Sequence, residues 1–103
     1  MSKKSEALNL LNEYSKYCKM EDKIAKEFEK TINSTIVPKE LRELRRKYNA
    51  QIDTLEAVKE SIYKKYYKIM TKEFGSIPYS VLKKYPYGFM DKGLVNDMFN
   101  KVG

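Results

Sequence analysis

The feature that most constrains the fold is a long run, residues 38–74, that has no internal glycine or proline. Pro38 suits the first position of a helix, and Gly75 suits the left-handed residue that often follows one. At about 1.5 Å per residue, such a helix would be roughly 55 Å long. In a chain of 103 residues, a helix of this length must be the spine on which the other segments pack. Its apolar residues recur at the three- and four-residue steps of one helix face, namely Leu41, Leu44, Tyr48, Ile52, Leu55, Val58, Ile62, Tyr66, Ile69 and Met70.

A second long helix is predicted for residues 3–32, with Ser2 or Ser5 as the candidate cap at its start. Its apolar stripe is wide enough to contact more than one neighbour, and Glu21 fills the one polar position in it. The short break at residues 33–37 predicts that the two long helices are antiparallel neighbours. Ile36 and Val37 are expected to cover that end of the hairpin. The stripe contains Ala7, Leu11, Tyr14, Cys18, Ala25, Phe28 and Ile32, with Leu10, Tyr17 and Ile24 beside them.

The C-terminal part, residues 76–102, predicts a short helix at 78–85 capped by Ser76, a turn at 86–88, and a last helix capped by Asp91. The predicted fold is therefore all-α, in one domain of residues 1–103. It is a long antiparallel helical hairpin (about 3–32 and 38–74) with two short C-terminal helices packed against it. A four-helix monomer would cover part of the apolar stripes. Pairing of two hairpins into a dimeric helical bundle, with coiled-coil-like packing, is the favoured alternative.

The charge of the chain favours an acidic partner. The formal net charge is +7, from 21 basic and 14 acidic residues, and the excess is concentrated in residues 59–103. Such a bias suits nucleic acid, an anionic membrane or an acidic protein. We expect no membrane partner, because the tyrosine-rich helix faces are not cleanly divided into polar and apolar sides. A low-GC genome also produces sequences rich in Lys, Asn, Ile and Tyr, and the size and composition fit a phage or other mobile element. No apolar run is long enough for a signal peptide or a membrane span, so a cytoplasmic location is expected.

The strongest candidate site for nucleic acid is the lysine- and tyrosine-rich stretch 62–72. Lysines neutralise phosphates and tyrosines stack on unpaired bases. The alternative is a solvated helix face whose lysine stems cover apolar surface. Lys83 and Lys84 add charge to the same half of the chain. The candidate residues of the stretch are Lys64, Lys65, Lys68, Lys72, Tyr63 and Tyr67.

A second basic group contains Arg42 and Arg46, one helical turn apart, with Arg45 and Lys47 beside them. Arginine forks suit phosphates or carboxylates. The alternative is a self-neutralised face, because Glu40 and Glu43 lie at spacings that allow pairing within the helix. Residues 77–101 also have the general layout of a helix–turn–helix motif, although two aspartates make its second helix a poor DNA reader.

Enzymatic sites find little support in the sequence. There is no histidine, and Cys18 is the single cysteine, so histidine-based metal and nucleophile sites are excluded. No glycine-rich phosphate loop occurs. Cys18 lies in the apolar stripe and is expected to be a small buried residue. We therefore expect no catalytic residues, no metal ligands and no cofactor.

Two functions follow as hypotheses. In the first, the chain is a non-enzymatic accessory protein that binds nucleic acid, or acts within a nucleic-acid machine, through its Lys/Tyr-rich surface. In the second, it is a protein–protein adaptor or inhibitor that acts through the apolar stripe. Binding in the first case should weaken steeply with salt, whereas in the second it should barely change.

Overall fold

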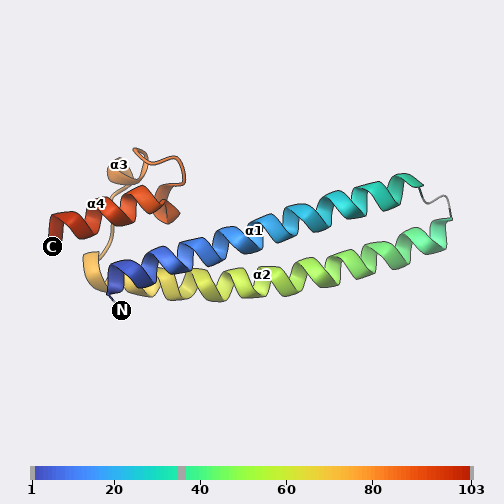
Figure 1. Cartoon of the computed structure of the whole chain (residues 1–103), viewed down its shortest axis with the longest axis horizontal. Coiled ribbons are helices and arrows are strands. Elements are labelled where there is room, and N and C mark those ends of the chain that lie inside the picture. The colour runs from blue at the N-terminus through green and yellow to red at the C-terminus, as the bar shows by residue number, and fades with distance from the viewer. Residues whose placement is uncertain (1, 35–36, 103) are drawn as a thin grey trace. The chain divides into compact units, whose positions relative to one another are not determined.

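The structure is a computed structural model that describes residues 2–34 and 37–102. Within these residues it contains helices and no β-strand, and the two long helices pack together as a helical hairpin (Figure 1). The prediction of an all-α fold is therefore confirmed. The elements are α1 (Lys3–Ser34), α2 (Pro38–Phe74), α3 (Tyr79–Leu82), the 3-10 turn η1 (Gly88–Met90) and α4 (Lys92–Val102).

The ends of the long helices follow the predicted local signals. The backbone N–H of Ser5 donates to the Ser2 hydroxyl at 3.1 Å, so Ser2 caps α1. Gly75 ends α2 with a φ of 68°, the left-handed conformation that glycine adopts without strain, and its N–H donates to the carbonyl of Thr71 at 2.8 Å. Of the residues predicted to cover the connection, Ile36 lies outside the described residues and Val37 is exposed.

The chain forms two compact units. Unit 1 contains residues 1–14 and 61–103, and unit 2 contains residues 15–60. The core of unit 1 brings together buried side chains from α1, α2 and α4, and Phe74 packs edge-on against Phe99 at 4.7 Å. This core is therefore shared by three helices. A pair of helices leaves part of its apolar surface open, and α4 covers that part here. Its six buried members are Ala7, Leu11, Tyr66, Met70, Leu94 and Val95.

The segment between α2 and α4 differs from the prediction in detail. The helix expected at 78–85 is only a single turn, α3. The backbone hydrogen bonds after it join residues three apart, as in the bond from the Tyr85 N–H to the Leu82 carbonyl, and this is the spacing of tight turns. Pro86 then prevents helix continuation. Ser76 does not cap α3, whose N-cap residue is Pro78.

Asp91 caps α4, as predicted, and also holds the turn before it. Its Oδ1 accepts the Gly93 N–H at 2.6 Å, and its Oδ2 accepts the Tyr87 N–H at 3.2 Å. Gly93 lies so close to this carboxylate that an added Cβ would be 2.8 Å from Oδ1. A side chain at position 93 would therefore force the capping carboxylate to shift.

Unit 2 consists of parts of α1 and α2, and its apolar stripes are only partly covered. Among its described residues, Leu55 is the one that is buried, at 9% exposure. Phe28 stacks on Tyr48 with ring centroids 4.4 Å apart, yet both residues remain half-buried. Cys18, predicted to be buried, is also half-buried, because no third helix within this unit covers it.

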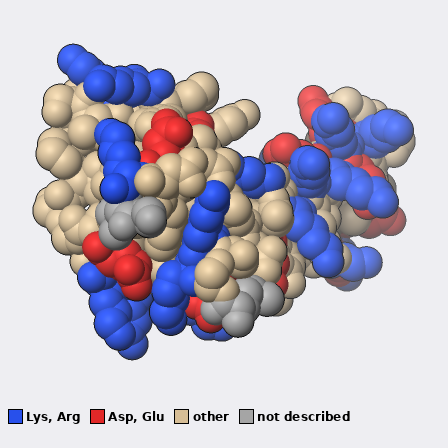
Figure 2. Space-filling view, turned by 60° about the vertical axis from the view of Figure 1, so that its left-hand side comes forward, with Lys and Arg blue, Asp and Glu red and all other residues tan. Residues whose placement is uncertain are grey.

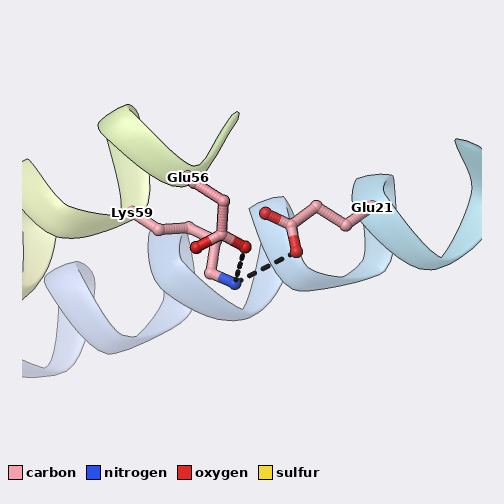
Figure 3. A network of polar contacts seen from close by, with 3 residues as sticks. All are labelled: Glu21, Glu56 and Lys59. Atoms are coloured by element: carbon pink, nitrogen blue, oxygen red, sulfur yellow. Dashed lines mark hydrogen bonds and ion pairs between the residues drawn. The ribbon is translucent and has the colours of Figure 1, made fainter. Parts of the chain in front are cut away.

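A polar cluster interrupts the apolar stripe of unit 2 (Figure 3). The Lys59 ammonium contacts Glu21 Oε2 at 3.1 Å and Glu56 Oε1 at 3.3 Å. The Lys59 and Glu21 side chains are only 13% and 16% exposed. The Glu21 side chain and the Lys59 ammonium lower the pKa of the Glu56 carboxyl. A mostly buried ion pair thus occupies the one polar position that the sequence placed in the stripe of α1.

Candidate nucleic-acid interface

Three of the predicted lysines, Lys65, Lys68 and Lys72, line a groove of about 520 Å³ between α1 and α2 in unit 1. Leu10 and Ile69 supply its apolar surface. The groove contains four basic and three acidic side chains, so it offers little net attraction to a phosphate backbone. The remaining lining residues are Lys3, Glu6, Asn9, Glu13 and Glu73.

The tyrosines of the predicted stretch point to a different neighbour. Tyr63 and Tyr67 lie beside the ring of Phe89, with centroid distances of 6.3 Å and 5.9 Å. They stay 38% and 51% exposed, respectively. Lys64 is exposed and is not among the groove residues. The groove is therefore lined by lysines of the stretch but not by its tyrosines.

The overall charge is also spread out. On the face drawn in Figure 2, lysine and arginine side chains occur in several separate groups, with Asp and Glu side chains among them. Unit 1 nevertheless carries ten basic and five acidic residues, whereas unit 2 carries eleven and nine. The excess of positive charge therefore belongs mainly to unit 1.

Two tyrosines that the sequence analysis did not select are the most exposed large hydrophobic residues described. Tyr79 is 78% exposed and Tyr87 is 79% exposed. Lys83 and Lys84 lie between them in sequence and are exposed too. The Lys83 N–H donates to the Tyr79 carbonyl, so these two residues lie one turn apart on the same side of α3. Residues 74–90 contain no Asp or Glu, so no carboxylate of this segment offsets the lysines.

The C-terminal side of the segment that carries these residues is held by hydrogen bonds at Tyr85 and Phe89. The Tyr66 hydroxyl donates to the Phe89 carbonyl at 2.6 Å, and burial, followed by the Asp91 charge, raises the pKa of that hydroxyl. Asp97 accepts a hydrogen bond from Tyr85, which raises the pKa of the Tyr85 phenol. Tyr87, whose own N–H donates to Asp91, therefore lies in a turn that hydrogen bonds hold on both sides.

The second predicted basic group lies in unit 2 and is exposed. Arg42 and Arg46 make no ion pair within 4.0 Å with Glu40 or Glu43, all of which are described residues. A face neutralised by Glu40 and Glu43 stays an alternative prediction, although these carboxylates form no close ion pair with Arg42 or Arg46. Arg42 and Arg46 remain available for a ligand of their own unit.

Sites of other kinds are not evident in the described part of the chain. No group of three or more His, Cys, Asp or Glu side chains there could hold a metal ion. None of the described helices is long and apolar enough to cross a membrane. Comparison with protein-family models, with curated proteins and with solved structures gives no match to this chain.

Proposed function

We propose that this protein is a non-enzymatic helical accessory protein that binds single-stranded nucleic acid. The observation that carries this proposal is the pair of exposed rings, Tyr79 and Tyr87, on a segment that also presents Lys83 and Lys84 between them in sequence. A cytoplasmic location, and a source in a phage or other mobile element, belong to the same proposal.

The chemistry of the turn favours unpaired bases over a duplex. A tyrosine ring that is about four-fifths exposed offers a flat surface, and stacking on a base contributes about 1–3 kcal/mol. Such stacking requires a base that is not already stacked in a helix. The lysines between the rings would neutralise the phosphates that join neighbouring nucleotides. No sequence preference follows, because every base has a face on which tyrosine can stack.

The residues selected from the sequence take secondary parts in this proposal. Lys64, Tyr63 and Tyr67 belong to unit 1 and would extend the contact beyond the turn. The groove lysines Lys65, Lys68 and Lys72 would contribute less, since carboxylates share the groove. Arg42 and Arg46 would act only as an independent contact within unit 2.

The test is fluorescence anisotropy of labelled single-stranded and duplex oligonucleotides at low and moderate salt. Replacing both Tyr79 and Tyr87 with alanine should raise the Kd for single strands about 10- to 100-fold, whereas replacing both with phenylalanine should leave it nearly unchanged. Replacing Lys83 and Lys84 with glutamine should make the dependence of log Kd on log salt concentration less steep. The slope should fall by about 1.4, because each phosphate contact on a single strand contributes about 0.7.

The matched control removes the same charge elsewhere. Lys23 and Lys26 are exposed residues of α1 in unit 2, and their replacement with glutamine should affect binding little. An equal loss in this control would mean that only net charge matters. Absence of binding at low salt, or equal loss in the phenylalanine and alanine variants, would refute the proposal.

A second candidate function is protein binding through the apolar stripe of unit 2, as an adaptor or inhibitor. The observation that favours it is the half-exposed stack of Phe28 on Tyr48 in a unit with one buried described residue. Two contacts between α1 and α2 support antiparallel helices in this unit, Glu21 with Lys59 and Phe28 with Tyr48. A later residue of α1 contacts an earlier residue of α2, which is the order expected when the two helices run in opposite directions. Association of two copies into a homodimer is part of this candidate, and it should be insensitive to replacement of Tyr79 and Tyr87.

A further inference from the structure

The groove of unit 1 has walls of unlike charge. The α1 wall carries Glu6, Glu13 and Lys3, a net charge of −1, and the α2 wall carries three lysines (Lys65, Lys68 and Lys72) and Glu73, a net charge of +2. Lys3 pairs with Glu6 at 3.3 Å. Among the described residues, no ion pair within 4.0 Å joins Glu13 to any of the three lysines. Among the described residues, the groove therefore presents two carboxylates, Glu13 and Glu73, and three lysines that have no ion pair within 4.0 Å.

The helix direction places these charges at matching levels. If α1 and α2 are antiparallel, as proposed above, residues of α1 and α2 whose numbers sum to nearly the same value lie side by side. The pairs Glu21–Lys59 and Phe28–Tyr48 give this relation for unit 2. Applied to α1 and α2 in unit 1, it places Glu13 level with Lys65 and Glu6 level with Lys72.

A two-fold axis parallel to the helices would exchange the two walls. When two such grooves face each other about this axis, α1 of one copy lies over α2 of the other, at the same level. Glu13 of each copy then faces Lys65 of its partner, and Glu6 faces Lys72. Leu10 and Ile69 of both copies meet in the centre. The surface is complementary to itself, which neither a uniformly acidic partner nor nucleic acid would match.

We infer that the groove formed by α1 and α2 in unit 1 is the docking surface for a second copy of this chain. This inference rests on the homodimer of the second candidate function, but it assigns the dimer interface to the groove of unit 1 instead of the apolar stripe of unit 2. The charges of the two walls determine how the copies are oriented. If α1 of one copy faced α1 of the other, walls of like charge would meet and repel each other. The small apolar floor supplies the buried contact.

The experiment is sedimentation analysis of the full chain, alone and as mixed variants, over a range of concentrations. Glu13→Lys and Lys65→Glu each create two like-charged pairs in a symmetric dimer, so each alone should raise the dimer Kd about 10- to 100-fold. A mixture of the two variants restores opposite charges at both positions. It should therefore form a heterodimer about as tightly as the unmodified chain. Lys26→Glu, an exposed lysine of unit 2, is the control for net charge and should leave the dimer Kd unchanged.

The possible failures are distinguishable. A dimer that tolerates both groove variants, but is lost when Phe28 is replaced with serine, would overturn the groove assignment and leave the homodimer intact. A chain that stays monomeric at every concentration tested would overturn both. Heterodimer recovery in the mixture, without recovery in either variant alone, supports the groove.

Discussion

Removal of the Lys59 ammonium is expected to destabilise the hairpin by about 2–3 kcal/mol. Breaking a fully buried ion pair from one side costs about 3–5 kcal/mol, and an exposed pair is worth about 0–1 kcal/mol. Lys59 and Glu21 are 13% and 16% exposed, which places their pair between these limits but nearer the first. Glu21 Oε1 is already buried without a hydrogen-bond partner among the described residues. In Lys59→Met, Glu21 would also lose the ammonium contact of its second oxygen.

The assay is urea unfolding at pH 7, followed by circular dichroism. With a slope of about 1–3 kcal/mol/M, the midpoint of Lys59→Met should fall by about 1–2 M. Lys47→Met, at an exposed position of α2, is the matched control and should change the midpoint little. If the unfolding free energies of the two variants differ by less than about 0.5 kcal/mol, the reasoning from burial is wrong.

A double variant separates the charge effect from packing. Glu21→Leu combined with Lys59→Met replaces the ion pair with apolar side chains inside an apolar stripe. Such replacements are often neutral or stabilising, because no charge remains to be desolvated. The double variant should therefore be at least as stable as the unmodified chain. A double variant as unstable as Lys59→Met would show that the pair contributes through shape rather than charge.

Two further predictions concern unit 1. The raised pKa of Tyr66 favours the neutral phenol in the folded state, so its contribution is complete below the unfolded pKa of about 10 and is lost as the pH rises further. In Tyr66→Phe, loss of the bond to the Phe89 carbonyl should cost about 1 kcal/mol at pH 7, and alkaline unfolding should become less steep, as measured by thermal melts from pH 8 to 11. Gly93→Ala should destabilise the protein although alanine favours helix by about 1 kcal/mol, because its Cβ would be 2.8 Å from Asp91 Oδ1. A higher melting temperature for Gly93→Ala would contradict this role of the glycine.

The long helices could be predicted from the sequence because their signals are local. Apolar spacing, Pro38 and Gly75 act within a few residues of the positions that they determine. The segment from Gly75 to Asp91 was less predictable, since its conformation depends on tertiary partners. The single turn of α3 and the double role of Asp91 follow from hydrogen bonds that close a loop, and no periodic pattern encodes them.

The candidate site was predicted in part for a similar reason. Residue type and spacing located the lysines, but not the carboxylates of α1 that share their groove or the Phe89 ring beside Tyr63 and Tyr67. Tyr79 and Tyr87 did leave a signal in the sequence, because each follows a proline and the stretch around them lacks acidic residues. That signal indicates a rigid, basic turn, whereas the exposure of its rings depends on the packing beneath it.

The core of unit 1 also has a consequence for the order in which we expect the chain to fold. Ala7 and Leu11 pack in one cluster with Leu94 and Val95, so this core closes a loop that spans most of the sequence. Helical proteins usually fold fast because their contacts are local, and a contact of this separation would forfeit that advantage through loop-closure entropy. Pairing of α1 with α2 from their short connection avoids the cost, since each successive turn shortens the loop that remains open. We therefore expect unit 2, despite its single buried described residue, to be the nucleation site from which the stable core is assembled.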